Sequence, residues 1–222
     1  MKNLDQIKWN TETLLQEMPD GVTLLAAAKT RSVEEVKAAY AAGIRHFGHN
    51  YVQEAKNMLE QVNFDVKWHM IGHLQRNKAK DAVELFDMVE TLDSIRLAEE
   101  LEKRCADAGR MLEVLIEINS GMEDEKTGVL PQDLNALVAV AASLPHIQLV
   151  GLMTMGPLTG EAKESRPYFV KTRRLFEELK RSNLPGVEMR VLSMGMSGSY
   201  RVAIEEGATM VRLGTALFGP RT

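Results

Sequence analysis

The sequence predicts a (β/α)₈ barrel, in which eight parallel strands alternate with helices, from three observations. Short apolar runs alternate with polar turns and amphipathic segments, which is the order of a parallel sheet covered by helices. Eight such runs occur in 222 residues, slightly below the ~250 residues typical of a barrel. Two long polar loops, 120–129 and 156–167, follow strands and precede helices, where barrels build their active sites.

The expected strands are nearly continuous apolar runs, as is typical of strands buried on both faces. They lie at 23–28, 45–50, 66–72, 88–93, 111–119, 147–155, 188–195 and 209–219. A leading helix precedes them, with its apolar side at Leu4, Ile7, Leu14 and Met18. No break in composition divides the chain, so we expect one domain over 1–222, with this leading helix (1–20) packed on the barrel.

The segments between the strands have helical spacing, with apolar residues three or four positions apart. One such stripe is Leu97, Leu101, Cys105 and Ala108. Ser32 and Glu35 are spaced as a capping box, and Pro131 suits a first helical turn. An open, doubly wound sheet is the alternative fold. Its glycine fingerprint is absent after the first strand, where the sequence reads Lys-Thr-Arg-Ser.

Composition narrows the class of function. A net charge of −4 argues against a surface for nucleic acid or anionic membranes. The lone Cys105 cannot form an intramolecular disulfide, which fits a reducing compartment, and its helical position indicates an apolar filler rather than a nucleophile. The first twenty residues are too polar for a signal peptide, and no apolar stretch approaches the ~18 residues of a membrane span. We therefore expect a cytoplasmic protein.

Polar side chains follow the carboxyl ends of the expected strands. Because these ends meet at one face of a barrel, the side chains should surround one ligand site. They are Lys29, Asn50, His73, Asp93, Asn119, Thr154, Ser193 and Arg212.

Lys29 is the most informative of these residues. It follows five apolar residues, so its side chain starts at the rim of the barrel. Loss of hydration there favours the neutral amine, which can attack a carbonyl carbon. The alternative is a lysine at a strand end that extends its ammonium group into solvent.

Two glycine-containing loops, 193–199 and 212–219, follow the seventh and eighth strands. Barrels often bind phosphate at these positions through backbone N–H groups and a helix N-terminus. Gly195 and Gly198 permit close approach of the backbone to an anion, and hydroxyl groups come from Ser197, Ser199 and Thr215. The alternative is ordinary turn chemistry, which the occurrence of two such loops at both expected places makes less favourable.

Arg212 interrupts an apolar strand and cannot be left unpaired in a barrel interior. It either pairs with a buried carboxylate or meets a ligand. If it faced a pyridine nitrogen, that nitrogen would stay unprotonated, because the permanent guanidinium charge disfavours a second positive charge. Pyridoxal phosphate would then be bound, but its electron-withdrawing chemistry would be weakened.

A lysine on strand one, phosphate loops after strands seven and eight, and an arginine on strand eight form a pattern that resembles fold-type III pyridoxal-phosphate proteins, whose barrel is of the alanine racemase N-terminal domain type. Over about residues 22–221 the chain is similar to the YggS/PROSC family of pyridoxal-phosphate homeostasis proteins. The similar segments are AAAKT (26–30), FGHNYVQEA (47–55), WHMIGHLQRNK (68–78), VLIEINSGMEDEKTG (114–128), GLMTM (151–155) and LSMGMSGSYRVAIEEGATMVRLGTALFGPR (192–221).

The resemblance implies that Lys29 carries pyridoxal 5′-phosphate as an internal aldimine. Asn50 and Met194 would border the pyridine ring, and Arg212 would face its nitrogen. The phosphate would be held by Ser197, Gly214 and Thr215. The family is implicated in cofactor homeostasis without an assigned reaction, and we expect a monomer that contacts apoenzymes transiently.

Two segments depart from the family pattern, which reads Gly-Glu-Asn-Tyr-Val-Gln-Glu around residue 49 and Val-Ser before the lysine. His49 replaces the glutamate, and Ala27 and Ala28 stand before Lys29. These changes put in doubt any role of that carboxylate and of one hydroxyl near the cofactor.

Two enzyme hypotheses compete with a carrier. A racemase or decarboxylase of the same fold needs an acid/base group opposite Lys29. Racemases that this fold resembles draw that group from a second domain, which a chain ending at Thr222 is not expected to have, leaving Tyr51 and His73 as local bases. A Schiff-base aldolase for a sugar phosphate would share the lysine and the anion loops, but it would not explain Arg212.

Other features have ordinary structural explanations. His69 and His73 have the spacing of a zinc helix, but on a strand their side chains diverge, so no metal is expected. The carboxylates of 123–125 are expected in a solvated loop. Four methionines on strands are first interpreted as packing: Met153, Met155, Met194 and Met196.

Overall fold

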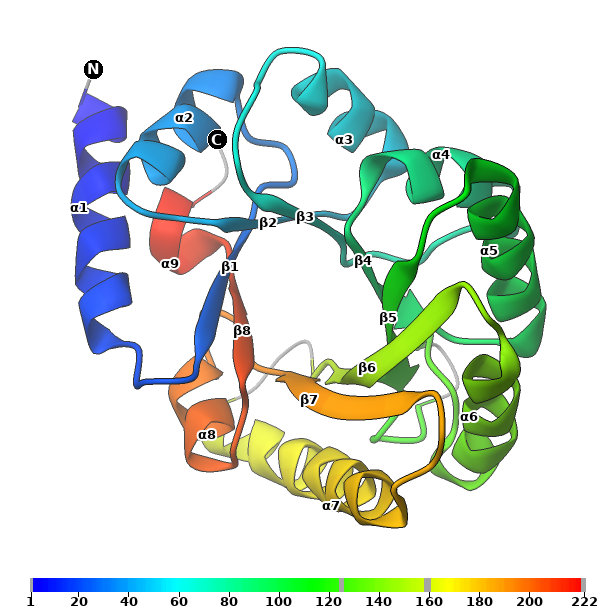
Figure 1. The fold of residues 1–222 in the computed structure, drawn as a ribbon. Helices are drawn as coiled ribbons and strands as arrows, with labels where there is room; N and C mark the ends of the chain where they lie inside the picture. Colours follow the sequence, from blue (N-terminus) through cyan, green and yellow to red (C-terminus); the bar gives the residue numbers. More distant parts are fainter. Residues whose placement is uncertain (1, 124–125, 158–160, 221–222) are drawn as a thin grey trace.

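The computed structural model describes residues 2–123, 126–157 and 161–220, and of residues 2 and 3 only the backbone. Its eight strands form a closed, parallel barrel in the order β1 to β8 (Figure 1). The strands are β1 Thr23–Ala27, β2 His46–His49, β3 Lys67–Met70, β4 Met88–Leu92, β5 Leu112–Ile118, β6 Ile147–Thr154, β7 Val187–Ser193 and β8 Met210–Leu213. The predicted barrel is confirmed, and the open sheet is wrong.

The run expected as a strand at 209–219 divides into two elements. Its first part is β8, and its second part is the short helix α9 (Thr215–Phe218). An apolar run carries no period that separates a buried strand from a buried helix. The hydrophobic pattern therefore could not show where the strand ends.

Helices cover the outside of the barrel (Figure 1). They are α1 Lys2–Glu17, α2 Val33–Ala41, α3 Val52–Leu59, α4 Ala79–Leu85, α5 Ile95–Ala108, α6 Leu134–Ser143, α7 Arg166–Ser182 and α8 Tyr200–Glu205, with single turns η1 Arg76–Lys78, η2 Pro131–Asp133 and η3 Ala162–Ser165. The capping box is confirmed, because the Ser32 hydroxyl accepts from the Glu35 N–H and the Glu35 carboxylate accepts from the Ser32 N–H. Pro131 begins η2, as predicted.

The leading helix α1 lies beside α2 and α9 (Figure 1). Ile7 and Leu14 on its inner side are buried. The Asn10 amide donates to the Leu217 carbonyl oxygen at 2.9 Å, which fastens α1 to the end of the chain that follows β8. The N-terminal helix thus supports α9, whose first residue, Thr215, lines the cavity described below.

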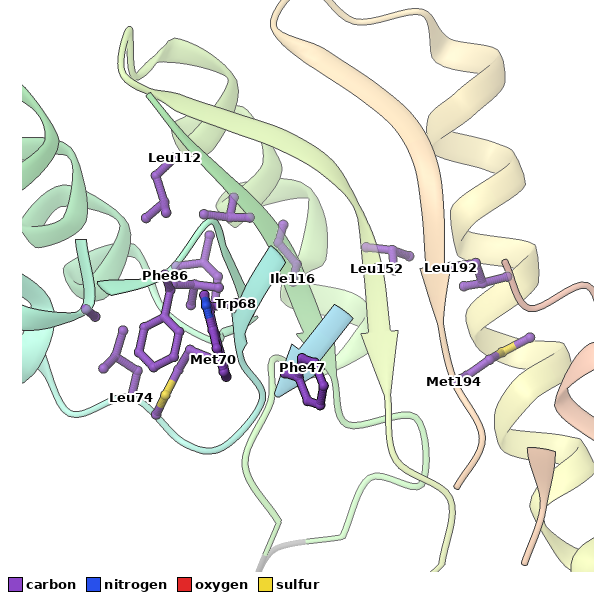
Figure 2. Packing of buried hydrophobic residues seen from close by; sticks show 14 of the residues in the cluster. Phe47, Trp68, Met70, Leu74, Phe86, Leu112, Ile116, Leu152, Leu192 and Met194 are labelled. Atoms are coloured by element: carbon purple, nitrogen blue, oxygen red, sulfur yellow. The ribbon is translucent and has the colours of Figure 1, made fainter. Parts of the chain in front are cut away.

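The apolar core has two layers, because neighbouring residues of a strand point to opposite faces. The outer layer lies between strands and helices, and Figure 2 shows part of it, with Phe47 and Trp68 stacked at 5.4 Å between ring centroids. Cys105 is completely buried in this layer, and burial raises the pKa of its thiol to about 11, as expected of a filler. The inner layer fills the barrel with Leu25, Ile71, Met88, Leu115, Val150, Met153, Val191 and Met210.

No helix in the described ranges is both long and apolar enough to cross a membrane.

Candidate functional site

A cavity of about 240 Å³ opens at the carboxyl end of the barrel. Its wall combines residues of β1 and β8 with residues that follow β1, β2, β3, β6, β7 and β8. The lining residues are Ala27, Lys29, Arg31, Asn50, Ile71, Met155, Met196, Ser197, Gly198, Arg212, Gly214 and Thr215. Six of the seven predicted cofactor-binding residues are among them. Segments that are distant in sequence therefore come together at the carboxyl ends of the strands, as predicted.

Lys29 lies two residues beyond β1 and lines the cavity. The Ala28 N–H still bonds the Gly48 carbonyl oxygen at 2.8 Å, so the chain stays extended to the rim. It then turns sharply at Thr30, whose φ of 62° is unusual for a β-branched residue. Backbone strain of this kind occurs at functional sites, and here it holds Lys29 at the mouth of the barrel.

Backbone N–H groups converge beside Lys29 at the start of α9. The N–H groups of Gly214 and Ala216 both donate to the Ser197 hydroxyl, at 3.3 and 3.1 Å. Thr215 and Gly198 line the same wall, and a Cβ added to Gly198 would meet nothing within 4 Å. This wall offers N–H and hydroxyl donors to an anion, as a phosphate requires.

Two residues of the predicted anion loops have structural roles instead. Gly195 has a φ of +93°, and a Cβ there would lie 2.5 Å from the Cβ of Ala203 in α8. Ser199 is buried and accepts a hydrogen bond from the Met196 N–H at 3.3 Å. Both residues shape the turn between β7 and α8, and neither lines the cavity.

Arg212 realises both of the alternatives that its sequence position left open. It is almost completely buried, lies 3.8 Å from the Glu90 carboxylate, and also lines the cavity. It donates to the Ser193 hydroxyl at 2.6 Å and to the Thr154 carbonyl oxygen at 2.9 Å. Burial lowers the pKa of the guanidinium, while the charges of Glu90 and Glu117 act against that shift. No pattern in the sequence indicates which carboxylate pairs with it.

Asn50 lines the cavity and has a buried acceptor. Its side-chain oxygen has no hydrogen-bond partner among the described residues, although buried polar atoms are nearly always paired. A ligand that donates a hydrogen bond would satisfy it. A fixed cation, an unpaired amide oxygen and a wall of N–H donors fit a flat, polar, phosphorylated ligand, and Lys29 can bond covalently to an aldehyde.

Met194 is the predicted site residue whose side chain is not brought to the cavity. It is completely buried and belongs to the outer layer of the core, where Figure 2 shows it near Leu192. The neighbouring Ser193 points into the barrel, so the next residue points outward. Met155 and Met196 line the cavity instead. Because side chains alternate along a strand, the sequence could have shown that Met194 and Ser193 point to opposite faces.

His69 of β3 and His73, which follows that strand, do not converge. His69 is buried against Glu90, with 2.8 Å between its Nδ1 and the carboxylate, whereas His73 pairs with Asp93 at 3.1 Å near the surface. Among the described residues, no three His, Cys, Asp or Glu side chains are placed to hold a metal ion. His49 stacks on Trp68 in the outer layer, and burial lowers its pKa to about 4. Residue 49 therefore faces away from the cavity.

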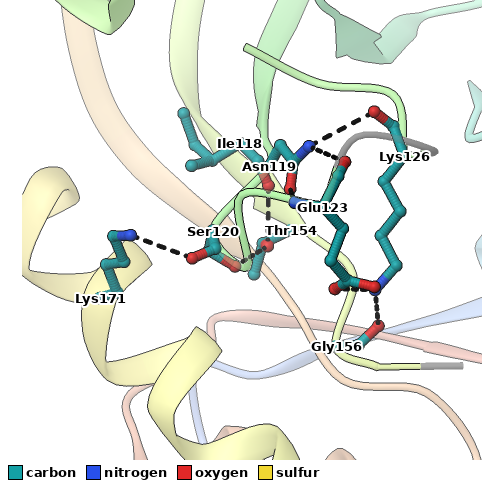
Figure 3. A network of polar contacts seen from close by, with 8 residues as sticks. All are labelled: Ile118, Asn119, Ser120, Glu123, Lys126, Thr154, Gly156 and Lys171. Carbon is teal, nitrogen blue, oxygen red and sulfur yellow. Dashed lines mark hydrogen bonds and ion pairs between the residues drawn. The ribbon is translucent and has the colours of Figure 1, made fainter. Parts of the chain in front are cut away.

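A polar network fixes the loop after β5 to the end of β6 (Figure 3). The Asn119 amide donates to the Glu123 carbonyl oxygen, and Lys126 pairs with the Glu123 carboxylate. The Ser120 and Thr154 hydroxyls lie 2.8 Å apart. The expected solvated loop is thus partly ordered by its own contacts, and its residues 124–125 lie outside the described ranges.

Comparisons with known proteins agree with this architecture. Residues 3–222 match the alanine racemase N-terminal domain family. The solved structure of PipY from Synechococcus elongatus superposes with a TM-score of 0.91 at 37% identity over 96% of this chain and 100% of that chain. Its structure with PLP bound gives 0.88 at 36% identity over the same shares of the two chains. Alanine racemase from Corynebacterium glutamicum shares the fold, with a TM-score of 0.82 at 22% identity over 98% of this chain and 62% of the racemase.

Fold and cavity together define a barrel of the alanine racemase N-terminal type with a lysine at its mouth. The chain is 40% identical to the pyridoxal phosphate homeostasis protein of Pasteurella multocida over 99% of this chain and 97% of that protein. It is 42% identical to the protein of that name from Aquifex aeolicus, over 89% and 86%. The chain belongs to the pyridoxal phosphate homeostasis protein family, and the resemblance inferred from its motifs is confirmed.

Proposed function

We propose that this chain binds pyridoxal 5′-phosphate in the cavity at the carboxyl end of the barrel and serves in homeostasis of that cofactor. The observation that carries the proposal is that Lys29 and Arg212 lie around one cavity with Ser197, Gly214 and Thr215. The bound cofactor of PipY and the names of the relatives support the same ligand. When bound, pyridoxal phosphate supplies an aldehyde carbon and an electron-withdrawing ring.

Six of the lining residues have proposed roles. Lys29 attaches the cofactor covalently as a Schiff base, and Asn50 lies at the edge of the ring. Arg212 faces the ring nitrogen and disfavours its protonation. The phosphate is bound by Ser197, Gly214 and Thr215.

The proposed activity is binding and delivery rather than conversion of an amino acid. A racemase or decarboxylase would need a second base near Lys29. Tyr51 is 64% exposed, and His73 is paired with Asp93. Neither of these two candidates lines the cavity. The relatives carry the name of a homeostasis protein rather than of an enzyme.

The proposal extends to the molecular setting. We expect one functional domain over 1–222, acting as a monomer in the cytoplasm, because the described wall of the cavity comes from a single chain and Cys105 is a buried thiol. Delivery would proceed through transient contact with apoenzymes that use the cofactor. No role with nucleic acid is proposed, in keeping with the net charge of −4.

Borohydride reduction tests the proposal directly. The purified protein, mixed with pyridoxal phosphate, is expected to absorb visible light, and reduction should fix one cofactor on the peptide that contains Lys29. Protein that gains no mass after reduction, or that carries the label on another lysine, would contradict the proposed site.

A further inference from the structure

A chain of buried polar side chains runs through the barrel below the cavity. The first contact joins His46 to His69, with 3.0 Å between their ring nitrogens. His69 then lies 2.8 Å from one oxygen of Glu90, and the Ser193 hydroxyl donates to the other oxygen at 2.6 Å. Arg212 completes the chain by donating to Ser193 at 2.6 Å. The last four residues are at most 5% exposed.

Glu90 is the anion of this chain. It is completely buried, which acts to raise its pKa, but the hydrogen bond and charge of His69, the charge of Arg212 and the hydrogen bond of Ser193 outweigh burial and lower it. Glu90 therefore stays ionised inside the barrel and balances the charge of Arg212 at a distance of 3.8 Å. A buried ion pair of this kind is strongly disturbed when one partner is removed.

The hydrogen-bond directions fix the orientation of Arg212. A serine hydroxyl has one hydrogen, and at Ser193 it is given to Glu90, so the oxygen accepts from Arg212. The second anchor of the guanidinium is the Thr154 carbonyl oxygen at 2.9 Å. Two acceptors on different strands hold a planar group in one orientation, and further N–H groups of Arg212 remain for a ligand in the cavity.

We infer that Glu90 and Ser193 are positioning residues that aim the Arg212 guanidinium at the ring nitrogen of the bound cofactor. This inference rests on the proposed function, because it assigns that ring to the cavity. Neither Glu90 nor Ser193 lines the cavity, so both act through Arg212. Their removal should weaken recognition of the nitrogen without affecting the covalent attachment or the phosphate wall.

A ligand lacking the nitrogen separates this role from a general effect on the fold. Binding of pyridoxal phosphate is compared with binding of deazapyridoxal phosphate, in which a C–H group replaces the ring nitrogen. The proteins are wild type, Ser193→Ala and Glu90→Gln. Thr91→Val is the matched control, since the Thr91 hydroxyl is also buried and donates to the Gly72 carbonyl oxygen at 2.7 Å, but it has no contact with Arg212. Thermal unfolding of each protein confirms that it is folded.

Ser193→Ala should weaken pyridoxal phosphate about three- to tenfold more than the deaza analogue, as expected for one misaligned hydrogen bond. Glu90→Gln, where folded, should produce a larger difference, and Thr91→Val should produce none. Equal weakening of both ligands by Ser193→Ala, or no weakening, would overturn the inference while leaving the proposed function intact. Wild-type protein that binds neither ligand would instead refute the proposed function and the inference with it.

Discussion

The two ends of this barrel are both hollow and polar, yet they differ in how their polar groups are satisfied. The hollow at the amino end of the strands, of about 530 Å³, is larger than the cavity of about 240 Å³ that Lys29 lines at the carboxyl end. Its charges are paired within the protein: Lys67 with Asp87 at 3.0 Å, and Arg190 with Glu113. At the carboxyl end, Asn50 has a buried oxygen without a partner among the described residues, and two N–H groups share the Ser197 hydroxyl.

This difference shows why size and charge alone do not identify a binding site. Paired charges at the amino end gain little from a ligand, since binding would first have to break ion pairs. The unpaired Asn50 oxygen at the carboxyl end can gain a new hydrogen bond without the loss of an existing one. Barrels usually bind their ligands at the carboxyl face. In this barrel that face is distinguished by unsatisfied polar groups and not by the larger volume.

Lys29→Ala, at the carboxyl end, should have the largest effect on binding of pyridoxal phosphate. Removing the amine eliminates the only covalent link to the cofactor that we propose, so the visible absorption and the borohydride-fixed product should both disappear. Weaker binding should persist through the separate phosphate wall. Lys67→Ala, a lysine variant at the opposite end, is the control and should keep both signals. Full absorption in Lys29→Ala would refute the assignment.

Ser197→Ala combined with Thr215→Val should weaken pyridoxal phosphate on the order of 10²-fold, because each hydrogen bond to a charged group contributes roughly 1.5–3 kcal/mol. Unphosphorylated pyridoxal should be affected far less. Titration of both ligands by absorbance or calorimetry measures the ratio. If the two ligands lose affinity equally, the phosphate lies elsewhere in the molecule.

The buried His49 should make the free energy of unfolding depend on pH. Its pKa is about 4 in the folded protein, because burial disfavours the charged ring, and about 6.5 in an unfolded chain. Between these values the unfolded chain binds more protons, so the free energy of unfolding should decrease as the pH falls from about 6.5 toward 4. The loss from this residue is about 2–4 kcal/mol. Denaturation of wild type and His49→Leu across this range should show a flatter profile for the variant.

Binding of pyridoxal phosphate in the cavity is the control measurement for His49→Leu. Because His49 faces the outer layer, His49→Leu should leave the affinity for pyridoxal phosphate near neutral pH unchanged. A variant with the wild-type pH profile would show that other groups, such as His46, whose pKa burial and His69 also lower to about 4, dominate the acid response.

The smallest effect is expected at the amino end. Lys67→Ala with Arg190→Ala removes partly exposed ion pairs, which contribute about 0–1 kcal/mol each. Affinity for pyridoxal phosphate should remain within about twofold of wild type. A large loss of affinity would mean that the two ends are coupled through the buried chain from His46 to Arg212.

Several features were predictable because they depend on local sequence. The apolar runs located all eight strands, and the polar residues at the expected strand ends identified Lys29, Asn50 and Arg212 as neighbours at one face. A parallel barrel brings the ends of its strands together whatever residues they carry, so a one-dimensional pattern was sufficient. Met194 shows the limit, since the side of the strand to which a residue points must be counted from a neighbour of known direction.

The sequence by itself determined the barrel, the lysine at its mouth and the loops that we propose bind the phosphate. Only the tertiary structure decided that Arg212 pairs with Glu90 through Ser193, that His69 completes the pairing of that carboxylate, and that the charges at the amino end neutralise one another. These contacts join strands that are far apart in the chain. Which inward side chains meet inside a closed barrel depends on the stagger of its strands, and no local pattern of residues encodes that stagger.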